Sequence, residues 1–124
     1  MKKEQVVYEL LNSANNNGVV ATLYGVFGKS VNVRIPFSKK ACEAGIDEID
    51  FSVRASNSMK RAGIFTVGDA IDLIADDGLL RIRNLGKKTQ NEIKTRIMEF
   101  GYERLTTNEK KIFFLDVIER NCVN

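Results

Sequence analysis

Residues 50–104 contain a series of short helical patterns with a stop signal after each, and this feature constrains the fold more than any other. Ser52 can cap a helix that we expect to reach Ala62 and to end at Gly63, since glycine readily adopts the left-handed conformation that terminates helices. A capping-box variant, Thr66-Val67-Gly68-Asp69, predicts the start of a second helix. Short helices with frequent turns predict a compact all-α domain here.

The alternation of helix and stop continues toward the C-terminus. Asp76-Asp77-Gly78 is expected to break the second helix, and one helical turn is expected over residues 79–82. Apolar residues at helical spacing predict a longer helix from Gly86 to about Phe100, with Gly101 as its stop. A second capping box predicts a final helix, which is apolar on more than one face and therefore expected to be buried inside the molecule or against a partner.

The first 45 residues carry a different pattern. Helical spacing predicts one helix over residues 4–15. Residues 19–27 and 30–37 are rich in β-branched and aromatic side chains, and Gly28-Lys29 between them suits a two-residue hairpin turn. We therefore predict an α+β fold. Its parts are a helix plus β-hairpin module over residues 1–45, an all-α helix-hairpin-helix domain over 46–104 and a C-terminal packing helix over 105–124.

The residue types argue against catalysis and metal binding. The chain has no histidine, which removes the commonest general base. Cys42 and Cys122 have no Cys or His neighbours with which to bind zinc, and we expect both to be reduced. We therefore expect a protein that is not an enzyme and uses no cofactor or metal. No apolar run is long enough to cross a bilayer, so we expect it in the cytoplasm with no membrane partner.

Positive charge is concentrated around one turn. The formal net charge is +3, yet Leu79 to Arg96 alone carries six Lys or Arg residues against a single acid, Glu92. A run of charges is usually a solvated face. Here the charges flank a Gly-containing turn, and this placement favours an anionic partner.

The turn Asn84-Leu85-Gly86-Lys87-Lys88-Thr89 can bind phosphate through its main chain. The first N–H groups of the helix that follows have no helical partners, and the helix dipole adds positive charge at the same point. Gly86 lets an oxyanion approach the backbone closely, and Lys87 and Lys88 add full charges. An ordinary turn with solvated lysines explains the same residues about as well.

The helix after Ser52 carries a second set of candidate residues. Arg54, Asn57, Ser58 and Arg61 recur at i, i+3, i+4 and i+7, so we place them on its outer face. Arginine can enter a narrow minor groove, while Asn and Ser can reach base edges or phosphates. Beside a phosphate-binding turn, this stripe suggests DNA.

Three segments together carry a family resemblance. They are residues 49–60, residues 64–69, and the turn at 84–89 with Glu92-Ile93-Lys94 after it. In order and spacing they resemble the C-terminal domain of the bacterial RNA polymerase α subunit, and the similarity covers residues 46–104. The large assembly domains of an α subunit are not in this sequence, so we expect a stand-alone relative.

The resemblance implies a helix-hairpin-helix domain that binds the minor groove of A·T-rich promoter DNA and docks on transcription activators. It implies that Arg54 enters the groove, with Asn57 and Ser58 beside it, although Ser58 stands where the best-known members have cysteine. The remaining predicted DNA-binding residues are Arg61, Gly86, Lys87, Lys88, Thr89 and Glu92.

Three functions stay open at this point. The first is a non-enzymatic DNA-binding protein that acts in transcription or its regulation, with double-stranded DNA as partner through its minor groove and phosphate backbone. RNA polymerase or a transcription factor is a further candidate partner. The second is a protein–protein adaptor to the transcription machinery that does not bind DNA. The third is a helix-hairpin-helix DNA-repair enzyme, for which Asp116 is the candidate acid although its setting is that of a surface position.

Overall fold

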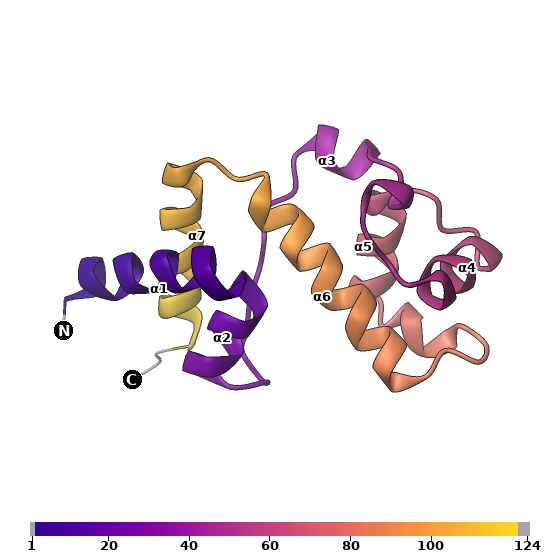
Figure 1. Cartoon of the computed structure of the whole chain (residues 1–124), viewed down its shortest axis with the longest axis horizontal. Helices are drawn as coiled ribbons and strands as arrows, with labels where there is room; N and C mark the ends of the chain where they lie inside the picture. The colour runs from indigo at the N-terminus through magenta and orange to yellow at the C-terminus, as the bar shows by residue number, and fades with distance from the viewer. Residues whose placement is uncertain (1, 122–124) are drawn as a thin grey trace. The chain divides into compact units, whose positions relative to one another are not determined.

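The structure, a computed structural model, describes residues 2–121, and every regular element in that range is a helix (Figure 1). In chain order the elements are α1 (Lys3–Asn17), α2 (Val19–Phe27), α3 (Lys39–Glu43), η1 (Ile46–Glu48), α4 (Val53–Arg61), α5 (Val67–Ala75), η2 (Gly78–Arg81), α6 (Lys87–Glu103) and α7 (Thr107–Asn121), where η marks a 3₁₀ helix. Over residues 2–121 there is no β-strand, and one isolated bridge joins Gly45 to Thr66. No helix in this range is long and apolar enough to span a membrane. Cys42 is a half-buried free thiol, and Cys122 lies outside the described residues.

The predicted α+β fold is wrong, because the segment assigned to the first strand of the hairpin forms α2. Its buried residues follow helical spacing and pack α2 on α1; they are Val19, Val20, Thr22 and Leu23. β-branched residues weaken a helix by at most about 0.7 kcal/mol each. Burying an aliphatic side chain such as Leu23 stabilises by about 1.5–3 kcal/mol. Burial therefore outweighs strand propensity in this segment.

The glycines that flank α2 end helices. Gly18 has φ 91°, and its N–H donates to the Ala14 carbonyl at 2.9 Å, which ends α1. Gly28 has φ 83° and ends α2 in the same way, by donating to the Tyr24 carbonyl at 3.0 Å. The predicted two-residue hairpin turn at Gly28-Lys29 is therefore wrong as well.

Residues 31–38 follow α2 without regular secondary structure. Along residues 31–37, side chains alternate between half-buried and exposed. The side chain of Asn121 accepts a hydrogen bond from the Asn32 N–H at 2.7 Å and donates one to the Asn32 carbonyl at 2.8 Å. The alternation therefore reflects one-sided packing of an extended segment, with no β ladder.

The structure divides into two compact units. One joins the residues up to Pro36 with those from Gly101 onward, and the other is Phe37–Phe100. Helix α6 begins in the second unit and ends in the first. The domain bounds expected from the sequence, with boundaries near residues 45 and 104, stay a prediction.

In the first unit, α1 packs against both α2 and α7. Four apolar side chains of α7 are buried, Phe113, Phe114, Val117 and Ile118, whereas Ile112 is exposed. This burial favours the inside-the-molecule alternative for the final helix. Tyr102 makes edge-on ring contacts with Phe113 and Phe114, at centroid distances of 5.7 and 5.6 Å. Its hydroxyl is buried with no hydrogen-bond partner among residues 2–121, and this burial raises the pKa of Tyr102 to about 12.

The second unit has its own core, built from α3, η1, α4, α5, η2 and α6. The core residues are Ala41, Ile46, Ala55, Met59, Ile64, Val67, Ala70, Leu79, Leu85, Ile93, Ile97 and Phe100. The predicted helix signals hold here. Ser52 Oγ accepts from Ala55 N–H at 3.1 Å, and Gly63 has φ 82° after α4.

The start of α5 agrees with its predicted cap, whereas the end of α6 differs from the prediction. The capping box is present, with Thr66 Oγ1 accepting from Asp69 N–H at 3.1 Å and Asp69 Oδ2 accepting from Thr66 N–H at 3.2 Å. The predicted stop at Gly101 is wrong, because α6 continues to Glu103. Gly101 costs a helix about 1 kcal/mol relative to Ala. Burial of its neighbours Phe100 and Tyr102 offsets that cost.

Candidate nucleic-acid interface

A tight connection joins η2 to α6 in the second unit. Leu85 N–H donates to the Ile82 carbonyl at 3.3 Å, and the Leu85 side chain is buried in the core, which anchors the turn. Asn84 has φ 63°, a left-handed conformation that asparagine tolerates better than most residues. The two helical elements and this turn form the helix-hairpin-helix that the sequence predicts.

The N-terminus of α6 is open to an anion. The Gly86 carbonyl accepts the first helical hydrogen bond, from Gln90 N–H at 3.0 Å, so Gly86 occupies the capping position. It has no side chain with which to satisfy the amides of the first turn, and that turn carries no acidic residue. A Cβ built on Gly86 would meet no atom within 4 Å. Neither packing nor a positive φ requires glycine at this position. Because glycine has no side chain, the amides of the first turn stay accessible.

The predicted site residues fall into an exposed set and a covered set. Exposed are Arg54, Asn57, Arg61, Gly86, Lys87 and Lys88. Ser58 is only 6% exposed and Thr89 only 8%, so Ser58 does not lie on the outer face where the sequence pattern places it. Ser58 lies on α4 and Thr89 lies on α6, the two helices at which the exposed residues are found.

Glu92 connects the two predicted halves of the site. Its carboxylate accepts from Ser52 N–H at 2.7 Å and from the Ser52 hydroxyl at 2.8 Å. Ser52 caps α4 and lies two residues before Arg54. The contact therefore ties α6, one turn after the hairpin, to the end of α4 that carries Arg54. Sequence reasoning placed Glu92 at the interface but missed this contact.

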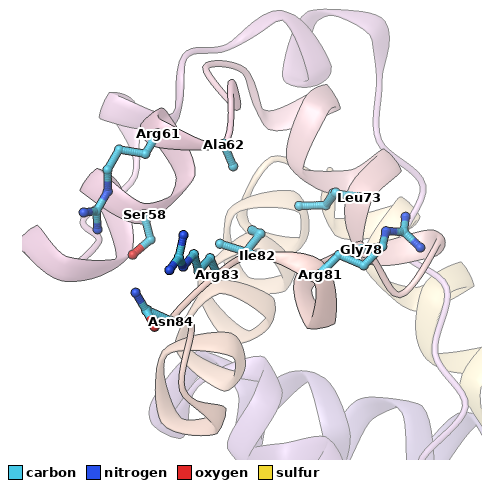
Figure 2. Close-up of a pocket in the computed structure, with 9 residues that line it drawn as sticks. All are labelled: Ser58, Arg61, Ala62, Leu73, Gly78, Arg81, Ile82, Arg83 and Asn84. Carbon is cyan, nitrogen blue, oxygen red and sulfur yellow. The ribbon is translucent and has the colours of Figure 1, made fainter.

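A cavity of about 470 Å³ opens beside the hairpin (Figure 2). Its polar lining comes from Ser58, Arg61, Arg81, Arg83 and Asn84. Figure 2 shows Ser58, Arg61, Arg83 and Asn84 gathered on one side, whereas the guanidinium of Arg81 points away from them. Of these residues, the sequence pattern indicated Ser58 and Arg61 as DNA-binding side chains, and Asn84 only as the first residue of the phosphate-binding turn. Arg81 and Arg83 were not predicted as site residues, although the dense positive charge over Leu79 to Arg96 was a signal for both.

Most of the positive charge near the hairpin has no internal counter-ion. Lys60 pairs with Asp47 at 2.9 Å, and Arg81 lies 3.9 Å from Asp76. Within residues 2–121, no ion pair involves Arg54, Arg61, Arg83, Lys87 or Lys88. Such an uncompensated cluster attracts polyanions and raises their rate of association.

The fold and this interface define a class of protein, a helix-hairpin-helix module with a positively charged, uncapped helix start. The family model for the C-terminal domain of the bacterial RNA polymerase alpha subunit matches residues 36–99. The protein belongs to this family. The matched range coincides with the unit Phe37–Phe100 to within one residue at each end. The resemblance drawn from the sequence is thereby confirmed, and the family is a non-catalytic domain of the transcription machinery.

A relative with the same domain is the "DNA-directed RNA polymerase subunit alpha" of Symbiobacterium thermophilum. It is 44% identical over 62 residues, which are 50% of this chain and 19% of the relative. The chain therefore spans about a fifth of the length of that relative. No solved structure matches the chain significantly.

Proposed function

We propose that the unit Phe37–Phe100 binds double-stranded DNA and acts in transcription. The observation that carries this proposal is the open N-terminus of α6, which lies among cations that have no internal partner and is tied to α4 through Glu92. Family membership supports a DNA-binding role of the same general kind.

The hairpin is proposed to hold a backbone phosphate. The free amides of the first turn of α6 donate to its oxygens, and Gly86 allows close approach. Lys87 and Lys88 add charge without reading sequence. Binding of this kind releases counter-ions, so affinity should fall steeply as salt rises.

Arg54 and Asn57 are proposed to reach the adjacent minor groove. Both are exposed on the first two turns of α4. A·T-rich sequences narrow the groove and make its potential more negative, which favours an inserted arginine. The covered residue Thr89 then supports the surface from beneath, and Glu92 positions α4.

The test is a DNA-binding titration over a range of salt concentrations, measured by fluorescence anisotropy with an A·T-rich duplex. We expect Arg54→Glu with Lys88→Glu to weaken binding at least about 100-fold, since each change reverses one proposed contact. Lys39→Glu with Lys40→Glu is the matched control, because both lysines are exposed on α3 of the same unit. Equal affinities of the two double variants would refute the proposed interface.

A protein–protein adaptor is the second candidate. Val53, Phe65 and Leu80 expose large apolar side chains on the same unit, which suits contact with a protein surface. If the wild-type protein fails to bind duplex DNA even at low salt while it binds RNA polymerase, the adaptor function replaces the proposed one. As for the repair-enzyme hypothesis, Asp116 pairs with Arg120 at 2.7 Å on α7, so its carboxylate is engaged in a helix-surface ion pair.

A further inference from the structure

The cavity beside the hairpin has a mostly apolar lining, which includes Ala62, Leu73 and Ile82, and a polar part suited to an anion. Three arginines contribute to it, and no lining residue is acidic. Arg61 and Arg83 form no ion pair with any residue of the described range 2–121. Ser58 and Asn84 add a hydroxyl and an amide that can donate hydrogen bonds.

We propose that this cavity is a second phosphate site, which holds another backbone phosphate of the same duplex. The inference rests on the proposed DNA binding and extends it beyond the hairpin and the groove. Arg61 and Arg83 are its two charged ligands, and Arg81 contributes to the wall while its guanidinium lies near Asp76.

The position of the cavity fits the spacing of a DNA strand. Asn84 lines the cavity and lies two residues before Gly86, so the Cα atoms of these two residues are at most roughly 7 Å apart. Successive phosphates of one strand advance by about 3.4 Å along the helix axis. A strand with one phosphate on the hairpin amides would therefore bring a phosphate one or two nucleotides away to the cavity.

The chemistry of the lining favours a phosphate diester. Guanidinium groups match phosphate oxygens in a planar, two-pronged geometry. Ser58 is 6% exposed and lines the cavity, so its hydroxyl is held in place by the surrounding packing. The cavity is far larger than one water molecule, so a phosphate can enter with part of its hydration shell.

The first test compares Arg61→Gln with Arg83→Gln against Lys39→Gln with Lys40→Gln. Each double variant removes two positive charges from the same unit. We expect the arginine variant to lower the slope of log affinity against log salt by about 0.9, because one phosphate contact is lost, and to weaken binding about 10- to 50-fold near 150 mM salt. The lysine variant should keep the wild-type slope. Thermal unfolding of both variants checks that the fold is intact.

The second test identifies the ligand as a backbone phosphate. Single phosphates of the duplex are replaced, one position at a time, by neutral methylphosphonates. The phosphate that Lys88 contacts is first identified as the position where the replacement no longer weakens binding of Lys88→Gln. At a second position, one or two nucleotides away, the replacement should weaken binding of the wild type but leave the affinity of the arginine double variant unchanged.

The outcomes separate the two proposals. If wild type binds duplex DNA and the arginine variant keeps its affinity and salt slope, the second phosphate site is wrong while the proposed function stands. The same holds if no methylphosphonate position is coupled to Arg61 and Arg83. If wild type binds no duplex at any salt, the proposed function fails first.

Discussion

Glu92 on α6 accepts two hydrogen bonds from Ser52, the residue that caps α4. A carboxylate bound in this way orients α4 relative to the hairpin that precedes α6. Charge-assisted hydrogen bonds of this type are about twice as strong as neutral ones. The contact with Ser52 therefore explains why an acid, Glu92, lies in a positively charged segment.

Replacing Glu92 with Ala separates positioning from charge. Coulomb attraction alone predicts tighter DNA binding when a negative charge is removed near phosphates. We expect weaker binding, by about fivefold or more, because Ser52 and the start of α4 lose their anchor. Stability should fall by about 1–3 kcal/mol. Anisotropy titrations and denaturant unfolding measure the two effects, and an unchanged or higher affinity for the variant contradicts the positioning role.

Replacing Gly86 with Ala tests main-chain phosphate binding. The added methyl meets no protein atom within 4 Å, so the fold should tolerate it at a cost of no more than about 1 kcal/mol. The methyl does occupy the space an oxyanion needs, and we expect DNA affinity to drop about fivefold or more. A parallel Lys39→Ala variant provides the control for a harmless surface change. Wild-type affinity in the Gly86 variant would show that the amides are not contacted.

Replacing Gly25 with Ala tests the helical nature of α2. Gly25 lies inside α2, and a Cβ there finds nothing within 4 Å. In a helix interior this change stabilises by about 0.5–1 kcal/mol, because glycine loses more backbone freedom on folding than alanine does. Denaturant unfolding should show that gain, together with a slightly larger helical circular-dichroism signal. A loss of stability would favour an extended segment instead.

Replacing Tyr102 with Phe tests the buried hydroxyl. Burial raises the pKa of Tyr102 to about 12 from its ordinary 10.0. A raised folded-state pKa means that the neutral phenol favours the folded state below pH 10, and that this advantage is lost as pH rises toward 12.

We therefore expect the Phe variant to be at least as stable as wild type at pH 7, since no described partner loses a hydrogen bond. Above pH 10 its stability should decline less steeply than that of wild type. Unfolding curves collected between pH 7 and 12 provide the measurement. A clear loss of stability at pH 7 would mean that the hydroxyl has a partner.

The local signals of the second unit were sufficient to predict α4, α5 and the start of α6, but they did not predict α3 or η1. Ser52 caps α4, Thr66 opens α5 and Gly63 follows α4 with a positive φ, because a cap or a glycine stop depends on residues within one turn. The open start of α6 follows from Gly86 in the same way. These features, with the family resemblance, are what the sequence by itself determined.

Tertiary structure decided the rest, since each remaining feature depends on residues distant in sequence. The segment Val19–Phe27 is helical because its buried face packs on α1, which overrides its strand-like composition. Ser58 is covered although helical spacing aligns it with exposed residues. Glu92 and Ser52 meet across 40 positions of the sequence. The sequence predicts that the hairpin and the α4 stripe act together, but only the fold shows the Glu92–Ser52 contact that ties α6 to α4 and the arginine-lined cavity beside the hairpin.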